Sequence, residues 1–327
     1  MTDALRARQQ PAVDARAPHD ALFFDSPERL AEVAGPFLTR GLADGDAAVA
    51  VVSTPTARIL TEAMDGDPRL HVLDSADVYR ARTPAAITAF RRLAQQHDPG
   101  DGGRVRVVGE VDFGTTDREW LEWQRYEAVL NEALSGRPLW GLCLFDTRRL
   151  ADSVLESARH THPHVATAAG RHPNPAFLDP GDYLRSLPVP DEPLESTEPV
   201  LAVTDVDDFA ALRHAVTGAL APLRAQPEQA EDFLLAVDEM TSNAIRHGAP
   251  PVSLRLWIAD DRVVCAIGDG GPGWDDPFAG YGPAHGEDLS RGGMGLWLAR
   301  QLCDHVDISG DPARDGGVRV RLTTRLR

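Results

Sequence analysis

Lysine is absent from this 327-residue sequence, so all 33 of its basic residues are arginines. Without an ε-amine, the chain can supply neither a Walker A lysine nor a pyridoxal Schiff base. It also lacks the strand lysine that one class of kinases pairs with the nucleotide phosphates. A chain of this composition that handles ATP must neutralise the phosphates with Mg²⁺, arginine and backbone N–H groups.

Positive charge, paired cysteines and long apolar runs are also scarce. The 50 acidic residues against 33 basic ones give a net charge of −17, which disfavours direct nucleic-acid binding because phosphate contacts need clustered cations. Three widely separated cysteines provide neither a CxxC zinc motif nor a disulfide framework. No apolar run approaches the roughly 20 residues of a membrane span, and the first residues lack the apolar core of a signal peptide. We therefore expect a cytoplasmic protein without membrane contact.

Hydrophobic patterning divides the sequence into four segments. Residues 1–18 are polar and predict a disordered leader. Apolar strands that alternate with helical patterns predict a layered α/β domain over 19–175. Residues 176–198 are rich in proline and acid and predict a linker, and a second α/β domain follows over 199–327. The strands expected in the first domain are 21–24, 47–53, 70–74, 105–111 and 139–146.

A polar pair lies on the helix predicted over 227–247. Glu239 and Asn243 are one turn apart, beside a stripe of apolar residues at helical spacing. Both side chains can therefore point into one cleft next to the core. The alternative is that the pair merely covers a solvated face.

Two glycine motifs follow this helix. An apolar strand ends at Asp269, and Gly271 and Gly273 come directly after it, where they allow close backbone approach to a ligand. An ordinary Asp-Gly turn is the alternative. Further on, the glycine-rich residues 291–295 open a helix whose free N–H groups and positive dipole end suit a phosphate. The polar residues 275–290 between the motifs are expected to form a lid.

These elements, in this order and spacing, resemble the GHKL (Bergerat) class of ATP-binding domains, which includes histidine kinases, Hsp90, gyrase B and MutL. The stretch 199–327 is particularly similar to the anti-sigma factor serine/threonine kinases RsbW and SpoIIAB, whose fold is an α/β sandwich. The matching positions are Glu239, Asn243, Ala244, His247 and Gly248 in the first box, Asp269, Gly271 and Gly273 in the second, and Arg291, Gly293, Gly295 and Leu296 in the third. Gly316-Gly317 departs from the Gly-Thr usual in the family, which puts a threonine contact in doubt.

The resemblance implies ATP and Mg²⁺ as cofactors and assigns roles to individual residues. Asn243 would bind Mg²⁺, Asp269 would recognise the adenine amine, and Arg291 would approach the γ-phosphate. Glu239 would act as the catalytic base toward a serine hydroxyl or a water. The remaining ATP-binding positions would be His247, Gly271, Gly273, Gly293, Met294 and Gly295.

Residues 19–175 resemble the MEDS sensory domain, through sequences such as His-Asp-Ala-Leu-Phe-Phe at 19–24 and Leu-Cys-Leu-Phe-Asp at 142–146. The resemblance implies a RecA-like α/β fold without a working phosphate loop, because Ser-Thr-Pro-Thr at 53–56 replaces Gly-Lys-Thr. It also implies that the domain senses small organic or redox signals. Four residues are candidates for a sensory pocket or, equally, for buried structural roles: His19, Glu110, Glu127 and Cys143.

Two further histidine patterns have alternative interpretations. His160, His162 and His164 would share one face of a strand and could bind a metal, but Pro163 favours a polar helix-to-loop segment. His214 lies on a predicted helix without the acidic neighbour of a phosphoacceptor histidine.

The sequence therefore predicts a two-domain regulator in which a sensor controls an ATP-binding anti-sigma factor. By the resemblance, it would sequester a sigma factor and phosphorylate an anti-anti-sigma partner of STAS type, as a serine/threonine kinase. Two alternatives stay open: a binding module gated by ATP without phosphoryl transfer, and an atypical histidine kinase. A homodimer also stays open.

Overall fold

The computed structural model describes residues 18–79, 82–97, 102–221, 227–273, 275–282, 294–310 and 317–326. The expected leader lies outside these ranges except for its last residue. Two compact units make up the chain: residues up to 81 with 86–185, and residues 186–327 with 82–85. None of the described helices is both long and apolar enough to cross a membrane.

A seven-stranded sheet forms the centre of the N-terminal unit, in the order β3-β2-β4-β5-β1-β6-β7. All neighbouring strands are parallel except β6 and β7. The strands are β1 (His19–Phe24), β2 (Ala47–Val52), β3 (Leu70–Asp74), β4 (Val105–Gly109), β5 (Leu139–Asp146), β6 (His164–Thr167) and β7 (Gly170–Pro173). The first five confirm the predicted strands, and the mixed α/β layering confirms the predicted fold class.

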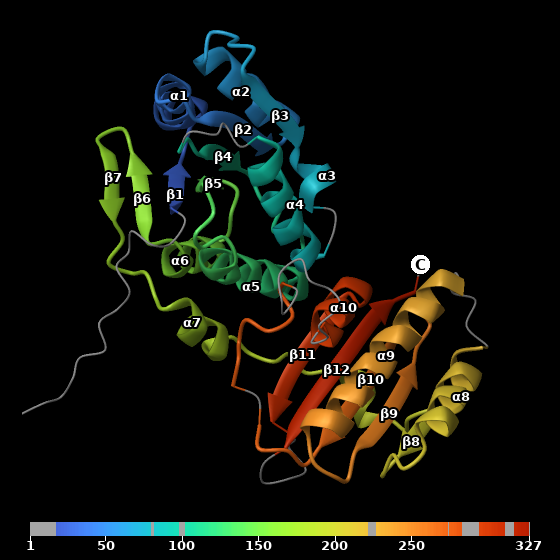
Figure 1. Cartoon of the computed structure of the whole chain (residues 1–327). Coiled ribbons are helices and arrows are strands. Elements are labelled where there is room, and N and C mark those ends of the chain that lie inside the picture. The colour runs from blue at the N-terminus through green and yellow to red at the C-terminus, as the bar shows by residue number, and fades with distance from the viewer. Residues whose placement is uncertain are drawn as a thin grey trace, which may run out of the picture. The chain divides into compact units, whose positions relative to one another are not determined.

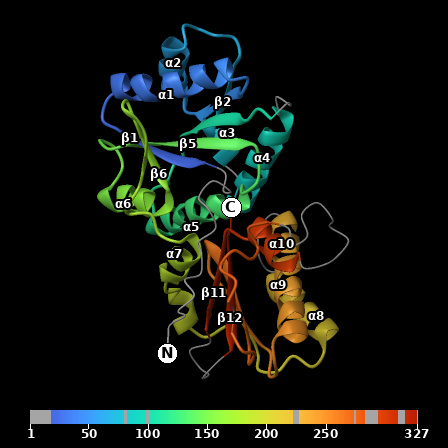
Figure 2. The ribbon, with the colours of Figure 1, turned by 60° about the vertical axis from the view of Figure 1, so that its left-hand side comes forward.

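Helices cover both faces of this sheet (Figure 2). The helices up to residue 186 are α1 (Pro27–Ala43), α2 (Thr54–Ala63), α3 (Ser75–Tyr79), α4 (Thr83–Gln96), α5 (Asp117–Ala133), α6 (Asp152–Thr161) and α7 (Pro180–Ser186). Helices α1 and α2 pack an apolar cluster against one face of the strands, whereas α4, α5 and α6 lie on the other. Ser26 caps α1, since its hydroxyl accepts from the N–H of Arg29 at 3.1 Å.

An antiparallel five-stranded sheet in the order β11-β12-β10-β9-β8 forms the C-terminal unit (Figure 1). Its strands are β8 (Leu201–Val203), β9 (Ser253–Ile258), β10 (Arg262–Asp269), β11 (His305–Gly310) and β12 (Val318–Arg325). One face of the sheet buries a large apolar cluster under α8 (Phe209–Leu220), α9 (Pro227–His247) and α10 (Gly295–Leu302). This two-layer α/β sandwich fits the predicted GHKL-type fold.

The segment predicted to be a linker is packed at both of its ends. Within the N-terminal unit, the Tyr183 hydroxyl lies 2.8 Å from Oγ of Ser157, and the tyrosine is buried. Residues 190–197, which include the 3₁₀ helix η2 (Pro193–Ser196), lie on the helix-free face of the second sheet, where Leu194 packs on Trp257. We call residues 190–197 the cover segment. The structure therefore assigns this polar segment to one unit or the other, although its Leu178 and Val189 side chains remain exposed.

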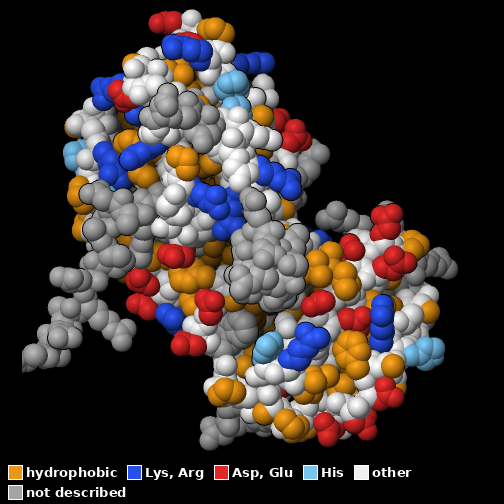
Figure 3. All heavy atoms as spheres, viewed as in Figure 1, with side chains coloured by type: hydrophobic (Ala, Val, Ile, Leu, Met, Phe, Trp, Pro, Cys, Tyr) orange, Lys and Arg blue, Asp and Glu red, His pale blue; other side chains and the backbone are white. Residues whose placement is uncertain are grey.

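Arginine and acidic side chains are both scattered over each unit on the face shown in Figure 3, with hydrophobic side chains between them. Several arginines are held in ion pairs: the nearly buried Arg106, for example, contacts Asp46 at 2.6 Å and Asp44 at 2.8 Å. Paired arginines of this kind are less available to other anions.

Candidate functional site

A cavity of about 520 Å³ opens between α9, the end of β10 and the start of α10. Its volume falls in the range of roughly 300–1,000 Å³ usual for small-molecule sites. The predicted site residues that line it are Asn243, His247, Asp269, Gly271 and Gly273. Residues predicted from two separate stretches of the sequence, 243–247 and 269–273, thus meet around one space.

Asp269 is the buried acid of this cavity, because it ends β10 with only 6% of its surface exposed. Its Oδ1 accepts the N–H of Gly271 at 2.7 Å, which fixes the carboxylate within the turn. A Cβ atom at Gly248 would lie 2.3 Å from this oxygen. Glycine is therefore required at the end of α9 for the carboxylate to occupy its position.

The polar pair of α9 meets the first turn of α10. A Cβ atom at Gly295 would lie 2.8 Å from Oε2 of Glu239 and 2.9 Å from Nδ2 of Asn243. The two side chains therefore point at the start of α10, and both are half-buried. Unpaired N–H groups at the start of a helix attract anions. A neutral amide oxygen, a carboxylate and these N–H groups together suit a phosphate with its cation.

Gly273 is predicted as a close-approach residue, and the structure gives a different reason for glycine there. Its φ is +107°, and a Cβ atom would meet none of the described residues within 4 Å. The backbone conformation, rather than space, excludes other residues.

Three predicted positions lie in or beside a part of the chain that is not described. Arg291 and Gly293 fall outside the described residues, so the structure places neither of them. Met294 is described, and it precedes α10 without a side-chain capping bond.

Apolar residues of the cavity were missed by reasoning from the sequence. Phe278 and Ala279 belong to the segment expected to be a lid. Ile308 lies on β11, and Val318 and Val320 lie on β12. The described part of the expected lid is packed on α10, where the guanidinium carbon of Arg300 lies 4.3 Å from the centre of the Tyr281 ring. Phe278 could have been predicted as a cavity residue from its aromatic side chain within a largely polar stretch.

Three of the four sensory candidates converge in the core of the N-terminal unit. Nε2 of His19 lies 3.2 Å from Sγ of Cys143 and 3.3 Å from Oε2 of Glu127. The fourth member of this group is His162, whose Nε2 lies 3.5 Å from the same glutamate oxygen. All four are buried. Burial lowers the pKa of His162 well below its usual value and raises the pKa of the Cys143 thiol well above its own.

The other histidines and the fourth candidate, Glu110, lie elsewhere. Glu110 accepts hydrogen bonds from the N–H of Ser53 at 2.8 Å and from its hydroxyl at 2.7 Å, and so holds the start of α2. His160 lies near Tyr183, and His164 pairs with Asp20 at 3.9 Å. Of the three alternating histidines, His162 alone belongs to the group of candidate metal ligands found among the described residues.

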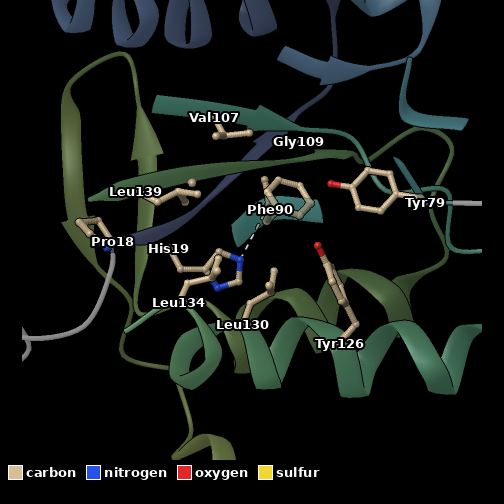
Figure 4. A pocket seen from close by; sticks show the side chains of 12 residues that line it. Pro18, His19, Tyr79, Phe90, Val107, Gly109, Tyr126, Leu130, Leu134 and Leu139 are labelled. Atoms are coloured by element: carbon tan, nitrogen blue, oxygen red, sulfur yellow. Dashed lines mark hydrogen bonds between the residues drawn. The ribbon is translucent and has the colours of Figure 1, made fainter. Parts of the chain in front are cut away.

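A small apolar pocket of about 20 Å³ borders this group (Figure 4). His19 and Cys143 form part of its wall together with two buried tyrosines, Tyr79 and Tyr126, whose hydroxyl groups point into it. The dashed line in Figure 4 is the hydrogen bond between His19 and Cys143. The pocket has room for about one water molecule.

Comparisons with known proteins agree with the two units. Residues 18–163 match the family model of the MEDS domain, the methanogen/methylotroph DcmR sensory domain. Residues 202–324 match the model of the histidine kinase-like ATPase domain.

Several proteins of named function are similar to the C-terminal unit. Two sequences of the serine-protein kinase RsbW of Bacillus licheniformis are similar to this chain. One is 32% identical over 126 residues and the other is 30% identical over 127 residues. Each match covers 35% of this chain and 76% of the relative. The RsbW of Bacillus subtilis strain 168 is 29% identical over 126 residues, with the same coverage. A solved structure of the RsbU and RsbW domains of a Mycobacterium tuberculosis protein aligns with 40% of this chain and 33% of that chain, at 24% identity and a TM-score of 0.28. The chain thus belongs to the RsbW family through its C-terminal unit, and it carries a MEDS domain in front of it.

Proposed function

We propose that the C-terminal unit binds Mg·ATP in the cavity beside α9 and phosphorylates a serine of a STAS-type anti-anti-sigma protein. In the same proposal it sequesters a sigma factor, and the MEDS domain controls which of the two partners is bound. The observation that supports this most is the contact of Gly295 with both Glu239 and Asn243, since it joins the start of α10 to the polar pair, of which Asn243 lines the cavity.

The proposed roles of the residues follow from their positions. The buried Asp269 carboxylate accepts a hydrogen bond from the adenine amine, and the apolar wall receives the ring. Asn243 would supply a neutral oxygen ligand to Mg²⁺, whose charge would offset that of the phosphates. Arg291 approaches the γ-phosphate, a role that matters in a chain without lysine.

Glu239 is proposed as the catalytic base. The serine oxygen of the partner attacks the γ-phosphorus, the bond to the β-phosphate oxygen breaks, and ADP leaves. The hydroxyl proton passes to the Glu239 carboxylate.

Incubation with labelled ATP and candidate STAS proteins tests the proposal. The kinase reaction gives an acid-stable phosphoserine on the partner. No transfer together with ATP-dependent complex formation would favour the gated binding module, and an acid-labile label on the chain itself would favour a histidine kinase.

A pair of variants tests the base. Glu239→Gln should lower the rate of transfer by about 10²–10⁴-fold with Mg·ATP affinity little changed. Glu231→Gln is the matched control, because Glu231 lies on the same helix and is exposed. Transfer at the wild-type rate by Glu239→Gln would remove the base from the proposal while leaving ATP binding intact.

A further inference from the structure

The buried group formed by His19, Glu127, Cys143 and His162 brings four possible metal ligands to one point. The four side chains come from β1, α5, β5 and the residue that follows α6. One nitrogen, oxygen or sulfur atom from each lies within 4.8 Å of the corresponding atoms of the other three. Three of these separations are 3.2, 3.3 and 3.5 Å.

These separations match a tetrahedral metal site. Zinc binds nitrogen, oxygen and sulfur at roughly 2.0–2.3 Å, so neighbouring ligand atoms around a tetrahedral ion lie roughly 3.3–3.8 Å apart. Two imidazoles, a thiol and a carboxylate form a donor set that zinc and similar borderline divalent ions accept. We propose that the N-terminal unit holds one divalent cation of the zinc class on these four residues.

The orientation of His162 supports the proposal. Its Nδ1 lies 2.8 Å from the carbonyl oxygen of Ala158, and a carbonyl can only accept, so this nitrogen carries the hydrogen. In the neutral ring, Nε2 then presents a lone pair toward Glu127. Metal-binding histidines are commonly fixed in this way through their other nitrogen.

The carboxylate of Glu127 is the second observation. Glu127 is 2% exposed, and neither of its oxygens has a hydrogen-bond partner among the described residues. Its short distances to His19 and His162 lack hydrogen-bond geometry, as expected when the atoms face a common point instead of one another. A buried carboxylate without a partner is costly, and a cation at that point would remove the cost.

Charge balance also agrees with a divalent ion. The thiolate of Cys143 and the carboxylate of Glu127 contribute two negative charges, and two neutral imidazoles contribute none, so the loaded site is neutral. Binding forms the metal–sulfur bond and releases the thiol proton to solvent, which leaves no net charge in the core.

The supporting shell comes from the same elements. Nδ2 of Asn131 on α5 donates to the carbonyl oxygen of Thr161 at 2.8 Å, which ties α5 to the end of α6 next to His162. Asp20, next to His19, accepts from the indole of Trp140 at 2.9 Å and from Arg171 at 2.8 Å. These bonds hold the ligand-bearing elements in register without using any of the four ligands.

The full-length chain tests the site directly. After expression with zinc and extensive dialysis, elemental mass spectrometry should find one equivalent of zinc per chain. Cobalt added to the metal-free chain should produce a sulfur-to-cobalt charge-transfer band. Absence of both the zinc and the band would overturn the proposal.

Matched variants assign the ligands. Cys143→Ser should abolish the charge-transfer band, whereas Cys303→Ser, a change at another buried cysteine, should keep it. His162→Gln should weaken cobalt binding by more than about 100-fold, the upper end of what loss of a supporting residue costs, and His160→Gln should not. Binding by Cys143→Ser and His162→Gln equal to that of the wild type would overturn the assignment.

A measurement on the unaltered chain covers the case in which the variants fail to fold. X-ray absorption of the zinc-loaded wild type should show one sulfur and otherwise nitrogen or oxygen neighbours. A zinc ion with no sulfur neighbour, or with two or more, would contradict the proposed set.

Discussion

Gly295 and Glu239 are in direct contact across α10 and α9, so that a Cβ atom on the glycine would lie 2.8 Å from the glutamate Oε2. The atoms it would meet are the ends of two flexible side chains, Glu239 and Asn243. A small side chain at 295 can therefore be accommodated by moving the polar pair, at little cost to folding.

We expect Gly295→Ala to leave the fold intact and to lower phosphoryl transfer by about 10²-fold, because a displacement of about 1 Å in a positioned group can cost that much. Gly218→Ala on α8 is the control, since a Cβ atom there meets nothing within 4 Å. That change should raise stability by about 0.5–1 kcal/mol. Transfer rates and thermal unfolding of both variants provide the check, and unaltered transfer in Gly295→Ala would contradict the expectation.

Asp269→Asn should weaken ATP binding at least tenfold. An amide keeps the acceptor that Gly271 uses at 2.7 Å, but it can place an NH₂ group where the adenine amine needs an acceptor. Loss of one charge-assisted hydrogen bond costs about 1.5–3 kcal/mol. Calorimetric titration with ATP measures the change, with Asp260→Asn in the exposed β9–β10 turn as control. Equal affinities for ATP in the wild type and Asp269→Asn would place the adenine elsewhere.

The cover segment should stabilise the C-terminal unit when that unit is expressed alone. Leu194 packs on Trp257, Val264 and Ala266, and the Trp257 indole donates to the carbonyl oxygen of Thr197 at 3.0 Å. A fragment of residues 199–327 exposes this face of the sheet and leaves the buried Arg321 with fewer partners. We expect it to be less stable than a fragment of 186–327 by on the order of 2 kcal/mol. Urea unfolding of the two fragments checks the difference, and equal midpoints would show that the cover contributes nothing.

Acid should release the cover segment through Glu192. Partial burial opposes ionisation of this side chain, but hydrogen bonds from Arg262 at 2.8 Å and from the N–H of Leu194 outweigh it, so the pKa of Glu192 lies below its ordinary value of 4.5. A lowered pKa in the folded state stabilises the fold above the ordinary value, and this contribution disappears as the pH falls through the lowered one. Glu192→Gln should therefore be less stable than the wild type at pH 7 and equal to it near the acid limit of folding. A stability difference that persists unchanged in acid would contradict this assignment.

The elements and the cavity of the C-terminal unit were accessible to sequence reasoning because their signals are local. The helix at 227–247 and the strand that ends at Asp269 follow from apolar periodicity, and α9 has the predicted limits. Strand β11 was not predicted: His305–Gly310 does alternate polar and apolar residues, but the stretch is short and only Val306 and Ile308 are apolar. Its contribution to the cavity, Ile308, was missed with it.

The buried group of the N-terminal unit could be predicted only in part from local sequence patterns. His19, Glu127 and Cys143 were singled out, but His162 was grouped with its neighbours in sequence, His160 and His164. The end of α6 turns its side chain into the core beside Phe145, whose ring centre lies 5.3 Å away. Spacing along the chain cannot reveal that turn, since it depends on contacts with α5 and β5.

Strand β1 is an interior strand of its sheet, and this position has a consequence while the protein is being synthesised. This strand pairs with β5 on one side and β6 on the other, and its His19 contacts a residue 124 positions further along the chain. At roughly 5–20 residues per second, a ribosome needs on the order of ten seconds to make that partner. During this interval the apolar residues of β1 have no native neighbour on either edge, so a nascent chain of this protein is a substrate for chaperones until β5 has left the ribosome.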